Sequence, residues 1–419
     1  MLVFRGRNCA LLFAFLWLPA TGTTAQSQTP PTELTLIDAV REARLRSPQS
    51  VEAMARVDAE KGRLAQAKLR PNPELDIAVE NFAGSRDFSG TRSAETTGSL
   101  AFPVELGGKR SARVNAATAG VTLAEAEAGM ARLDLDLAVR EAHVLAAEAE
   151  AAALLAAEDV DIARSLETAV TRLVEAGREP PLRRVTAAAE RAQSEAVAEL
   201  ASAERLAANE ALAALIGRER ADFRVPALAP MSSDGTPAQY AVSGPDLAAA
   251  QYQLSFAQAR LRDAKAQRVP DIRLNVGARR LAADDATAMV AGISVPFPLF
   301  NRNGGTIAAA AADVRGAEAA AVRLQRQAGA RLTAAEARSR AAAASFRTYD
   351  SVVVPSAAEA LQIARLGYAA GRFTYPDLLM AQRGYAEARR ARLSAARDAE
   401  LARAERDRAA GLDPIGDPQ

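Results

Sequence analysis

The stretch ISVPFPLFNRNGGTIAAAAADV, from Ile293 to Val314, changes character three times within twenty-two residues. It begins with strand-like alternation, passes through Pro296-Phe297-Pro298, crosses Asn-Arg-Asn-Gly-Gly and ends in alanines, which favour a helix. The stretch LAFPVELGGKRSARVNAATAGV, from Leu100 to Val121, makes the same change 193 residues earlier. A strand that runs directly into a helix therefore occurs twice, and we expect a duplicated architecture.

Prolines and glycines at both junctions have a structural task. Proline cannot donate to the hydrogen-bond ladder of a strand, and glycine tolerates the backbone angles of a sharp bend. We expect the chain to turn from strand to helix at the following residues: Pro103, Gly107, Gly108, Pro296, Pro298, Gly304 and Gly305.

Four segments alternate between apolar and polar residues, which is typical of strands with one apolar face and one solvent-exposed polar face. They are residues 74–82 and 95–104 in the first half, and 271–279 and 287–295 in the second. The expected polar face of the first and third segments carries Glu74, Asp76, Glu80, Asp271, Arg273 and Asn275. If the strands enclose a pore, the acids among these residues would favour cations, and the arginines would offset part of their field.

The rest of the chain has helical periodicity, interrupted by proline and glycine. We expect helices over about 36–69, 109–176, 182–216, 245–267, 305–370 with a kink at Pro355, and 376–410. Turns at Gly177-Arg178 and Gly371-Arg372 are offset by 194 residues. The domain plan is a leader over 1–25, a first repeat over 26–221, a linker over 222–244, a second repeat over 245–411 and a tail over 412–419.

Composition restricts the function classes. Aromatic residues are only 5% of the chain and alanine is abundant, which suits long helices that pack closely. Without the leader the chain has 50 basic and 51 acidic residues, so it lacks the basic surplus that nucleic-acid binding requires. Cys9 is the only cysteine and His143 the only histidine, so we expect no disulfide framework, zinc site, cofactor or catalytic centre.

The first 25 residues resemble a secretory signal, with Arg5 and Arg7 before a short apolar core and a small-residue cleavage site at Thr23-Thr24-Ala25. Cys9 precedes the apolar core, so we expect no lipid anchor. The remaining chain has no stretch of 18 consecutive apolar residues, so it would enter a membrane only as a β-barrel. Four strands cannot close a barrel alone. Three copies would supply twelve, within the range of outer-membrane barrels.

The chain resembles the TolC-like outer-membrane channels of tripartite efflux systems. The most specific segments are VPFPLFNRNGG at 295–305, GYAAGRFTYPDLLMAQR at 367–383 and ELGGKR at 105–110. The first of these resembles the branch that serves heavy-metal pumps of the cobalt–zinc–cadmium or copper–silver type. The resemblance implies a mainly α fold: a homotrimer with a twelve-stranded barrel in the outer membrane of a Gram-negative bacterium, continued by a long antiparallel α-helical barrel in the periplasm. It also implies a periplasmic adaptor and an inner-membrane, proton-driven transporter of the resistance-nodulation-division type as partners.

The same resemblance suggests site residues near the two turns. Tyr368, Arg372 and Asp377 match the neighbourhood of the periplasmic gate, and Gly177, Arg178 and Gly371 match the turns that contact the adaptor. Some relatives carry a second acid one turn after Asp377, where this chain has Met380. Asp377 also follows Pro376 at a helix start, so a role as a helix cap is an alternative that can coexist with gating.

Three alternative functions can be weighed against a metal-efflux channel. A periplasmic coiled-coil adaptor would explain the helices and leader, but not two hairpins placed identically in both repeats. A secreted enzyme lacks support because no cofactor or nucleophile motif is present. Within the family, a drug or protein exporter is the main alternative to a metal channel.

Overall fold

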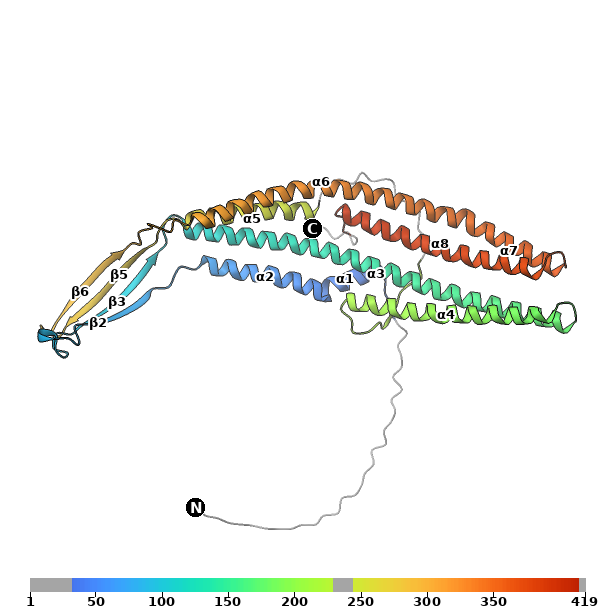
Figure 1. The fold of residues 1–419 in the computed structure, drawn as a ribbon, viewed down its shortest axis with the longest axis horizontal. Coiled ribbons are helices and arrows are strands. Elements are labelled where there is room, and N and C mark those ends of the chain that lie inside the picture. The colour runs from blue at the N-terminus through green and yellow to red at the C-terminus, as the bar shows by residue number, and fades with distance from the viewer. Residues whose placement is uncertain (1–31, 229–243, 414–419) are drawn as a thin grey trace, which may run out of the picture.

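A computed structural model describes residues 32–228 and 244–413 (Figure 1). The predicted leader over 1–25, most of the predicted linker and the last six residues of the tail lie outside the described residues.

Each half of the chain contains the same main succession: a helical segment, two strands, a long helical segment and a final helix. The first half has β1 (Thr32–Glu33), α1 (Leu36–Arg46), α2 (Pro48–Lys68), β2 (Glu74–Glu80), η1 (Arg86–Phe88), β3 (Glu95–Val104), α3 (Lys109–Glu175), α4 (Pro181–Leu215) and β4 (Phe223–Arg224). The second has α5 (Pro245–Ala266), β5 (Ile272–Leu281), β6 (Ala286–Ser294), α6 (Gly304–Thr348), η2 (Tyr349–Val353), α7 (Val354–Ala369) and α8 (Tyr375–Ala409). The predicted repeat is confirmed.

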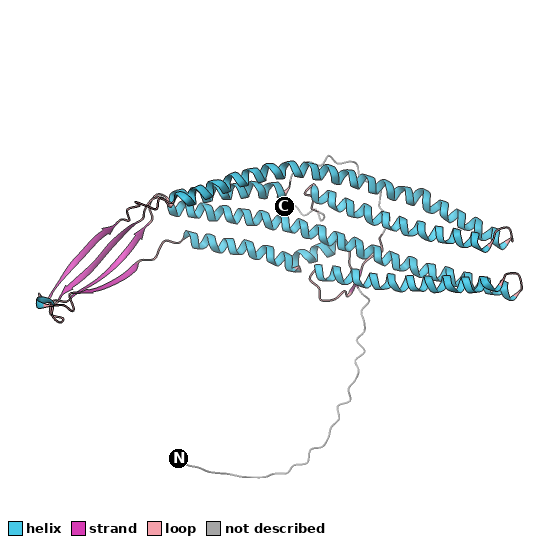
Figure 2. Cartoon of the chain, viewed as in Figure 1, coloured by secondary structure: helices cyan, strands magenta, loops and turns pink. Residues whose placement is uncertain are grey.

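The elements form one elongated layer, with the strands at one end and the two helical turns at the other (Figure 2). The sheet order is β2-β3-β5-β6, and all its neighbours are antiparallel. The helices follow the same order: α2 and α4 pack on α3, α3 on α5 and α8, and these on α6. The layer therefore has two open edges, formed by β2, α2 and α4 on one side and by β6, α6 and α7 on the other (Figure 1).

Two long helices are interrupted beside prolines. The prediction of one helix over 36–69 was wrong, because Ser47 adopts an extended ψ of 134° and α2 begins at Pro48. A residue before proline is sterically disfavoured in the helical region, and proline suits the first helical position. In the second repeat the predicted kink at Pro355 takes the form of a π turn, η2, between α6 and α7. The π turn lies just before the position where proline removes a helical N–H.

The predicted linker contains a strand that the sequence analysis did not identify. β4 pairs in parallel with β1, and the Leu34 amide donates to the Arg224 carbonyl at 2.9 Å. Both strands cover a core at mid-length of the helical layer, formed by Leu34, Val40, Leu135, Val139, Leu212, Ile216 and Phe223. His143 is buried beside it, with Nε2 3.1 Å from the Leu34 carbonyl oxygen, and burial lowers its pKa. His143 is thus a structural residue of this core.

No helix within 32–228 and 244–413 is both long and apolar enough to cross a membrane. Within the same ranges, no three histidine, cysteine, aspartate or glutamate side chains gather where they would hold a metal ion.

Candidate channel surfaces and turn sites

The strand register places most large apolar side chains of the sheet on one face. Leu281, opposite Glu95, and Val290, opposite Gly277, lie on the other face. Leu75 pairs with Leu100, Leu100 with Val276, and Val276 with Ala291. Residues that are directly opposite on neighbouring strands point to the same side of a sheet. The apolar face consists of Leu75, Ile77, Val79, Leu100, Phe102, Val104, Ile272, Leu274, Val276, Met289 and Ile293. Leu75 and Ile77 are 67% and 70% exposed, so this face has no cover within the chain.

The opposite face is polar and internally paired. Arg273 donates to Glu74 at 3.1 Å. Arg279 lies 3.3 Å from Glu80 and 2.9 Å from Glu95. Glu95 is a member that sequence reasoning missed. Of the four acids that were expected to favour cations, Glu74 and Glu80 are therefore paired with arginine. Asp76 has no ion pair among the described residues.

Asp271 lies just outside β5, at the junction and not within the strand face where it was predicted. Its carboxylate contacts Lys109 Nζ at 2.8 Å and accepts the Leu106 amide at 3.2 Å. Lys109 is the first residue of α3 and is 7% exposed at its side chain. Asp271 therefore ties the start of the second hairpin to the strand-to-helix junction of the first repeat.

The two junctions bend at different residue types. In the first, Gly107 and Gly108 have φ of 68° and 71°, and a Cβ on Gly107 would lie 2.6 Å from Val269. In the second, the left-handed residue is Asn303 with φ of 58°, whose side-chain amide donates to the Ala264 carbonyl at 2.8 Å. The expectation that Gly304 and Gly305 form this bend was wrong, because both already belong to α6. Asparagine tolerates the left-handed region, and the hydrogen bond holds it there.

Pro103, Pro296 and Pro298 lie where each strand approaches its helix. Pro103 is within β3 opposite Arg273, whereas Pro296 and Pro298 follow β6. β6 is an edge strand of the sheet, so the missing N–H groups of Pro296 and Pro298 interrupt no strand pairing within one copy of the chain.

Both helical turns have the same backbone geometry. Gly177 and Gly371 have φ of 69° and 71°. The Arg178 amide donates to the Leu173 carbonyl at 2.9 Å, and the Arg372 amide to the Gly367 carbonyl at 2.8 Å. This pattern satisfies carbonyls at a helix end and requires a residue that accepts a positive φ. The two predicted turns are therefore equivalent in structure.

A hydrogen bond joins the two turns. The Tyr368 hydroxyl donates to Glu179 at 3.1 Å, and burial together with this carboxylate raises the pKa of Tyr368 to about 12. Tyr375 is 1% exposed and packs edge-on against Tyr368, with ring centroids 6.3 Å apart. The guanidinium of Arg183 lies 5.4 Å from the centre of the Tyr375 ring. Sequence reasoning found Tyr368 but missed its partners, which come from both repeats.

The other two predicted gate residues have different surroundings. Asp377 accepts hydrogen bonds from the Thr374 amide at 2.8 Å and hydroxyl at 2.6 Å, forming a capping box at the start of α8. These bonds lower the pKa of Asp377. Arg372 is exposed and has no ion pair with any residue that the structure describes. No side-chain hydrogen bond or ion pair joins Tyr368, Arg372 and Asp377 to one another within the described chain. Their gating role stays a prediction.

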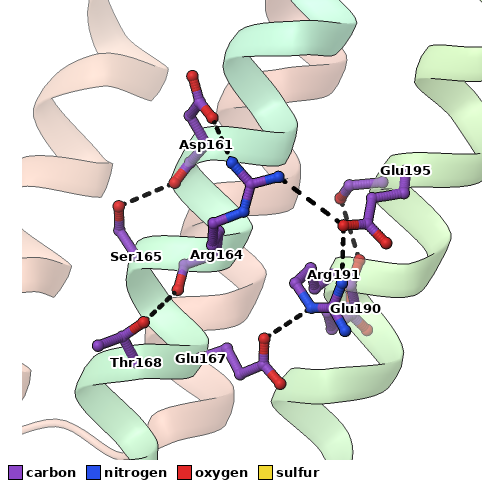
Figure 3. A network of polar contacts seen from close by, with 9 residues as sticks. Asp161, Arg164, Ser165, Glu167, Thr168, Glu190, Arg191 and Glu195 are labelled. Carbon is purple, nitrogen blue, oxygen red and sulfur yellow. Dashed lines mark hydrogen bonds and ion pairs between the residues drawn. The ribbon is translucent and has the colours of Figure 1, made fainter.

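Ion pairs also stiffen the first hairpin just above its turn (Figure 3). Arg191 of α4 bonds Glu167 of α3 and Glu195 of its own helix, each at 2.7 Å. Arg164 pairs with Asp161 at 3.0 Å and approaches Glu195 at 3.9 Å. The α3–α4 hairpin is therefore tied together near its turn by the Arg191–Glu167 ion pair between its two helices.

Comparison with known proteins assigns this architecture. The family model described as outer membrane efflux protein matches residues 39–218 and 237–412. The chain belongs to the outer membrane efflux protein family. The two matched segments correspond to the two structural repeats. Membership places this efflux protein in the outer membrane.

Individual members of the family resemble the chain over most of its length. The cobalt-zinc-cadmium resistance protein CzcC of Cupriavidus metallidurans is 32% identical over 349 residues, covering 80% of each chain. The outer membrane protein VceC of Vibrio cholerae has a TM-score of 0.76 at 24% identity, covering 90% of this chain and 96% of its own. CusC has a TM-score of 0.77 at 18% identity, covering 94% and 96%. The latter two similarities establish the fold.

Proposed function

We propose that this efflux protein is the outer-membrane channel through which a tripartite system exports heavy-metal cations. The observation that carries the proposal is the similarity to CzcC, which is named for cobalt, zinc and cadmium resistance. The channel would act as a passive conduit without enzymatic chemistry. Its partners would be a periplasmic adaptor and an inner-membrane proton-driven transporter.

The open layer supports assembly from three copies. The sheet ends in β2 and β6, and unpaired strand edges are unfavourable in lipid. Three sheets of four strands would close a twelve-stranded barrel with the apolar face toward lipid and the Glu74 and Arg273 face toward water. α3 has 67 residues and would extend the conduit by about 100 Å.

Metal passage without tight binding suits this arrangement. Conduction requires sites that release an ion as readily as they accept it. The carboxylates of the polar strand face are largely paired with arginine, which favours weak contact with a passing cation. Under this proposal Tyr368, Arg372 and Asp377 form the periplasmic gate, and Gly177, Arg178 and Gly371 contact the adaptor.

A deletion strain tests the substrate class. Growth would be measured across concentrations of cobalt, zinc, cadmium, copper and silver salts, beside a panel of dyes and antibiotics. We expect hypersensitivity to one or more metals and little change toward dyes, with restoration by the intact gene. Hypersensitivity to dyes with unchanged metal tolerance would assign the protein to drug efflux instead.

A further inference from the structure

The outer edge of α6 carries arginines that have no carboxylate partner. α6 packs on α5 and α8 through a stripe formed by Ala310, Ala317, Leu332, Ala335, Ser339 and Phe346. At about 100° per residue, Arg315, Arg323 and Arg326 lie on the opposite side. All three are exposed, and none makes an ion pair with a residue that the structure describes. The edge of the layer formed by α6 is thus positively charged along this segment.

The edge of α2, on the other side of the layer, carries carboxylates. Val57 is buried toward α3. Asp58 and Glu52 are turned from it in opposite senses, by about 100° and 140°, so they lie on either side of the outer edge of α2. Their side chains are 73% and 65% exposed. In each carboxylate, one oxygen contacts a cation of the same helix, Lys61 or Arg56. The second oxygen has no ion pair among the described residues.

The two sets of charges lie at matching heights. α2 ends at Lys68 below edge strand β2, and α6 begins at Gly304 below edge strand β6. Asp58 is about 15 Å along α2 from its end and Arg315 about 17 Å along α6 from its start. Glu52 and Arg323 are about 24 Å and 29 Å away from the same points. Each pair matches within one helical turn.

The two repeats as a whole differ in net charge in the same direction as the two edges. Residues 26–221 contain 31 acidic and 24 basic side chains, whereas residues 245–411 contain 16 acidic and 25 basic ones. Where α8 of the second repeat meets α3 of the first, arginines of α8 pair with acids of α3. Arg389 bonds Glu158 at 2.8 Å, Arg390 bonds Asp159 at 2.8 Å and Arg397 bonds Glu148 at 2.9 Å. The contact between repeats within one chain therefore already uses this charge pattern.

We propose that the α6 edge of one copy binds the α2 edge of the next copy through ion pairs, Arg315 with Asp58 and Arg323 with Glu52. The inference rests on the proposed trimer. In a closed ring, acidic and basic repeats alternate, so every contact between repeats joins opposite charge. The polarity also specifies direction, because contact between two α6 edges would bring together arginines that have no ion pair among the described residues.

Charge reversal tests the pairing. It is made on the α6 edge alone, on the α2 edge alone, and on both edges together. The variants are Arg315→Glu with Arg323→Glu, Asp58→Lys with Glu52→Lys, and all four changes together. Trimer and monomer would be quantified in detergent by light scattering, with circular dichroism to check folding. An exposed ion pair contributes a factor of about 1.4 to 5, so the loss of six pairs in a ring should reduce the trimerisation constant about sevenfold or more.

We expect either one-sided reversal to lower the trimer fraction and the four-fold variant to restore it. High salt should weaken the wild-type trimer in the same direction. Arg331→Glu is the matched control, since Arg331 is exposed on α6 but turned by about 160° from Arg315 and by about 80° from Arg323. A one-sided loss without restoration, or no loss at all, would overturn the pairing and leave the trimer intact as a proposal. A wild-type protein that is not trimeric would overturn the trimer itself.

Cross-linking gives a second measurement that does not depend on stability. The only natural cysteine is Cys9. Asp58→Cys combined with Arg315→Cys should give dimers and trimers with a short thiol-specific cross-linker, whereas Asp58→Cys combined with Arg331→Cys should not. Equal cross-linking of both combinations would contradict the proposed register.

Discussion

The hydroxyl of Tyr368 donates to Glu179 across 3.1 Å and so connects the turn of the second repeat to the turn of the first. The two residues are 189 positions apart in sequence. Tyr375, which packs against Tyr368, forms a core with Val170 and Ala187, and these residues again come from both repeats. The end of the layer that carries the turns is thus held together by contacts between hairpins, and movement of one hairpin away from the other must break them.

Removal of the Tyr368 hydroxyl should loosen this end. Tyr368→Phe keeps the ring packing on Tyr375 but deletes the bond to Glu179, which should cost about 0.5–1.5 kcal/mol. We expect higher or more frequently open conductance in planar bilayers. Tyr252→Phe, at a 40% exposed position on α5, is the control. Identical recordings for both variants would remove Tyr368 from the gate.

Arg372 and Asp377 separate gating from helix capping. Under the gating hypothesis, Arg372→Ser should raise the resting conductance, and Asp377→Asn should weaken block by trivalent cations added from the periplasmic side. If Asp377 only caps α8 through Thr374, its replacement should lower thermal stability slightly and leave conductance and block unchanged. Single-channel recordings distinguish these outcomes, with trimer yield measured in parallel.

The assignment of strand faces predicts contrasting effects at adjacent residues of β5. Leu274 lies on the apolar face and Asn275 on the polar one. Leu274→Arg, like Ile272→Arg, should cost about 2–4 kcal/mol in each copy if it meets the middle of the bilayer. Asn275→Arg should be tolerated. Heat-modifiable trimer recovered from outer membranes is the measurement, and equal recovery would show that the faces are assigned wrongly.

Two substitutions of Tyr375 should have opposite or very different effects on thermal stability. Its side chain is buried, and its hydroxyl has no hydrogen-bond partner among the described residues. Tyr375→Phe should therefore leave the thermal stability unchanged or raise it by up to about 1 kcal/mol. Tyr375→Ala should lower it by about 3–5 kcal/mol because it leaves a cavity. Thermal unfolding in detergent would measure both, and a large loss for Tyr375→Phe would reveal a partner for the hydroxyl.

His143 predicts a loss of stability in acid. Burial lowers its pKa, so the folded protein binds a proton less readily than the unfolded chain. The contribution of neutral His143 is fully present above the ordinary histidine pKa of about 6.5 and is lost as pH falls below it. The wild type should lose more stability between pH 7 and pH 5 than His143→Gln. Parallel pH profiles for the two proteins would contradict this.

The sequence by itself determined the local elements and their duplication. The strand predicted over 95–104 is β3 with the same bounds, and both turns lie at the predicted glycines. These features depend on alternation, helical periodicity and the backbone limits of proline and glycine, which act within a few residues. The apolar and polar faces of the strands follow from the same local pattern.

Only the tertiary structure decided which distant groups meet. β1 and β4 are two residues each, too short for any periodicity, and they pair because the linker packs on α3. Asp271 was expected in the strand face but bonds Lys109, since β5 begins one residue later. Of the predicted gate residues, Tyr368 meets Glu179 and Asp377 meets Thr374. Such partners depend on the relative position of whole helices, which is set by packing over the full length of the layer.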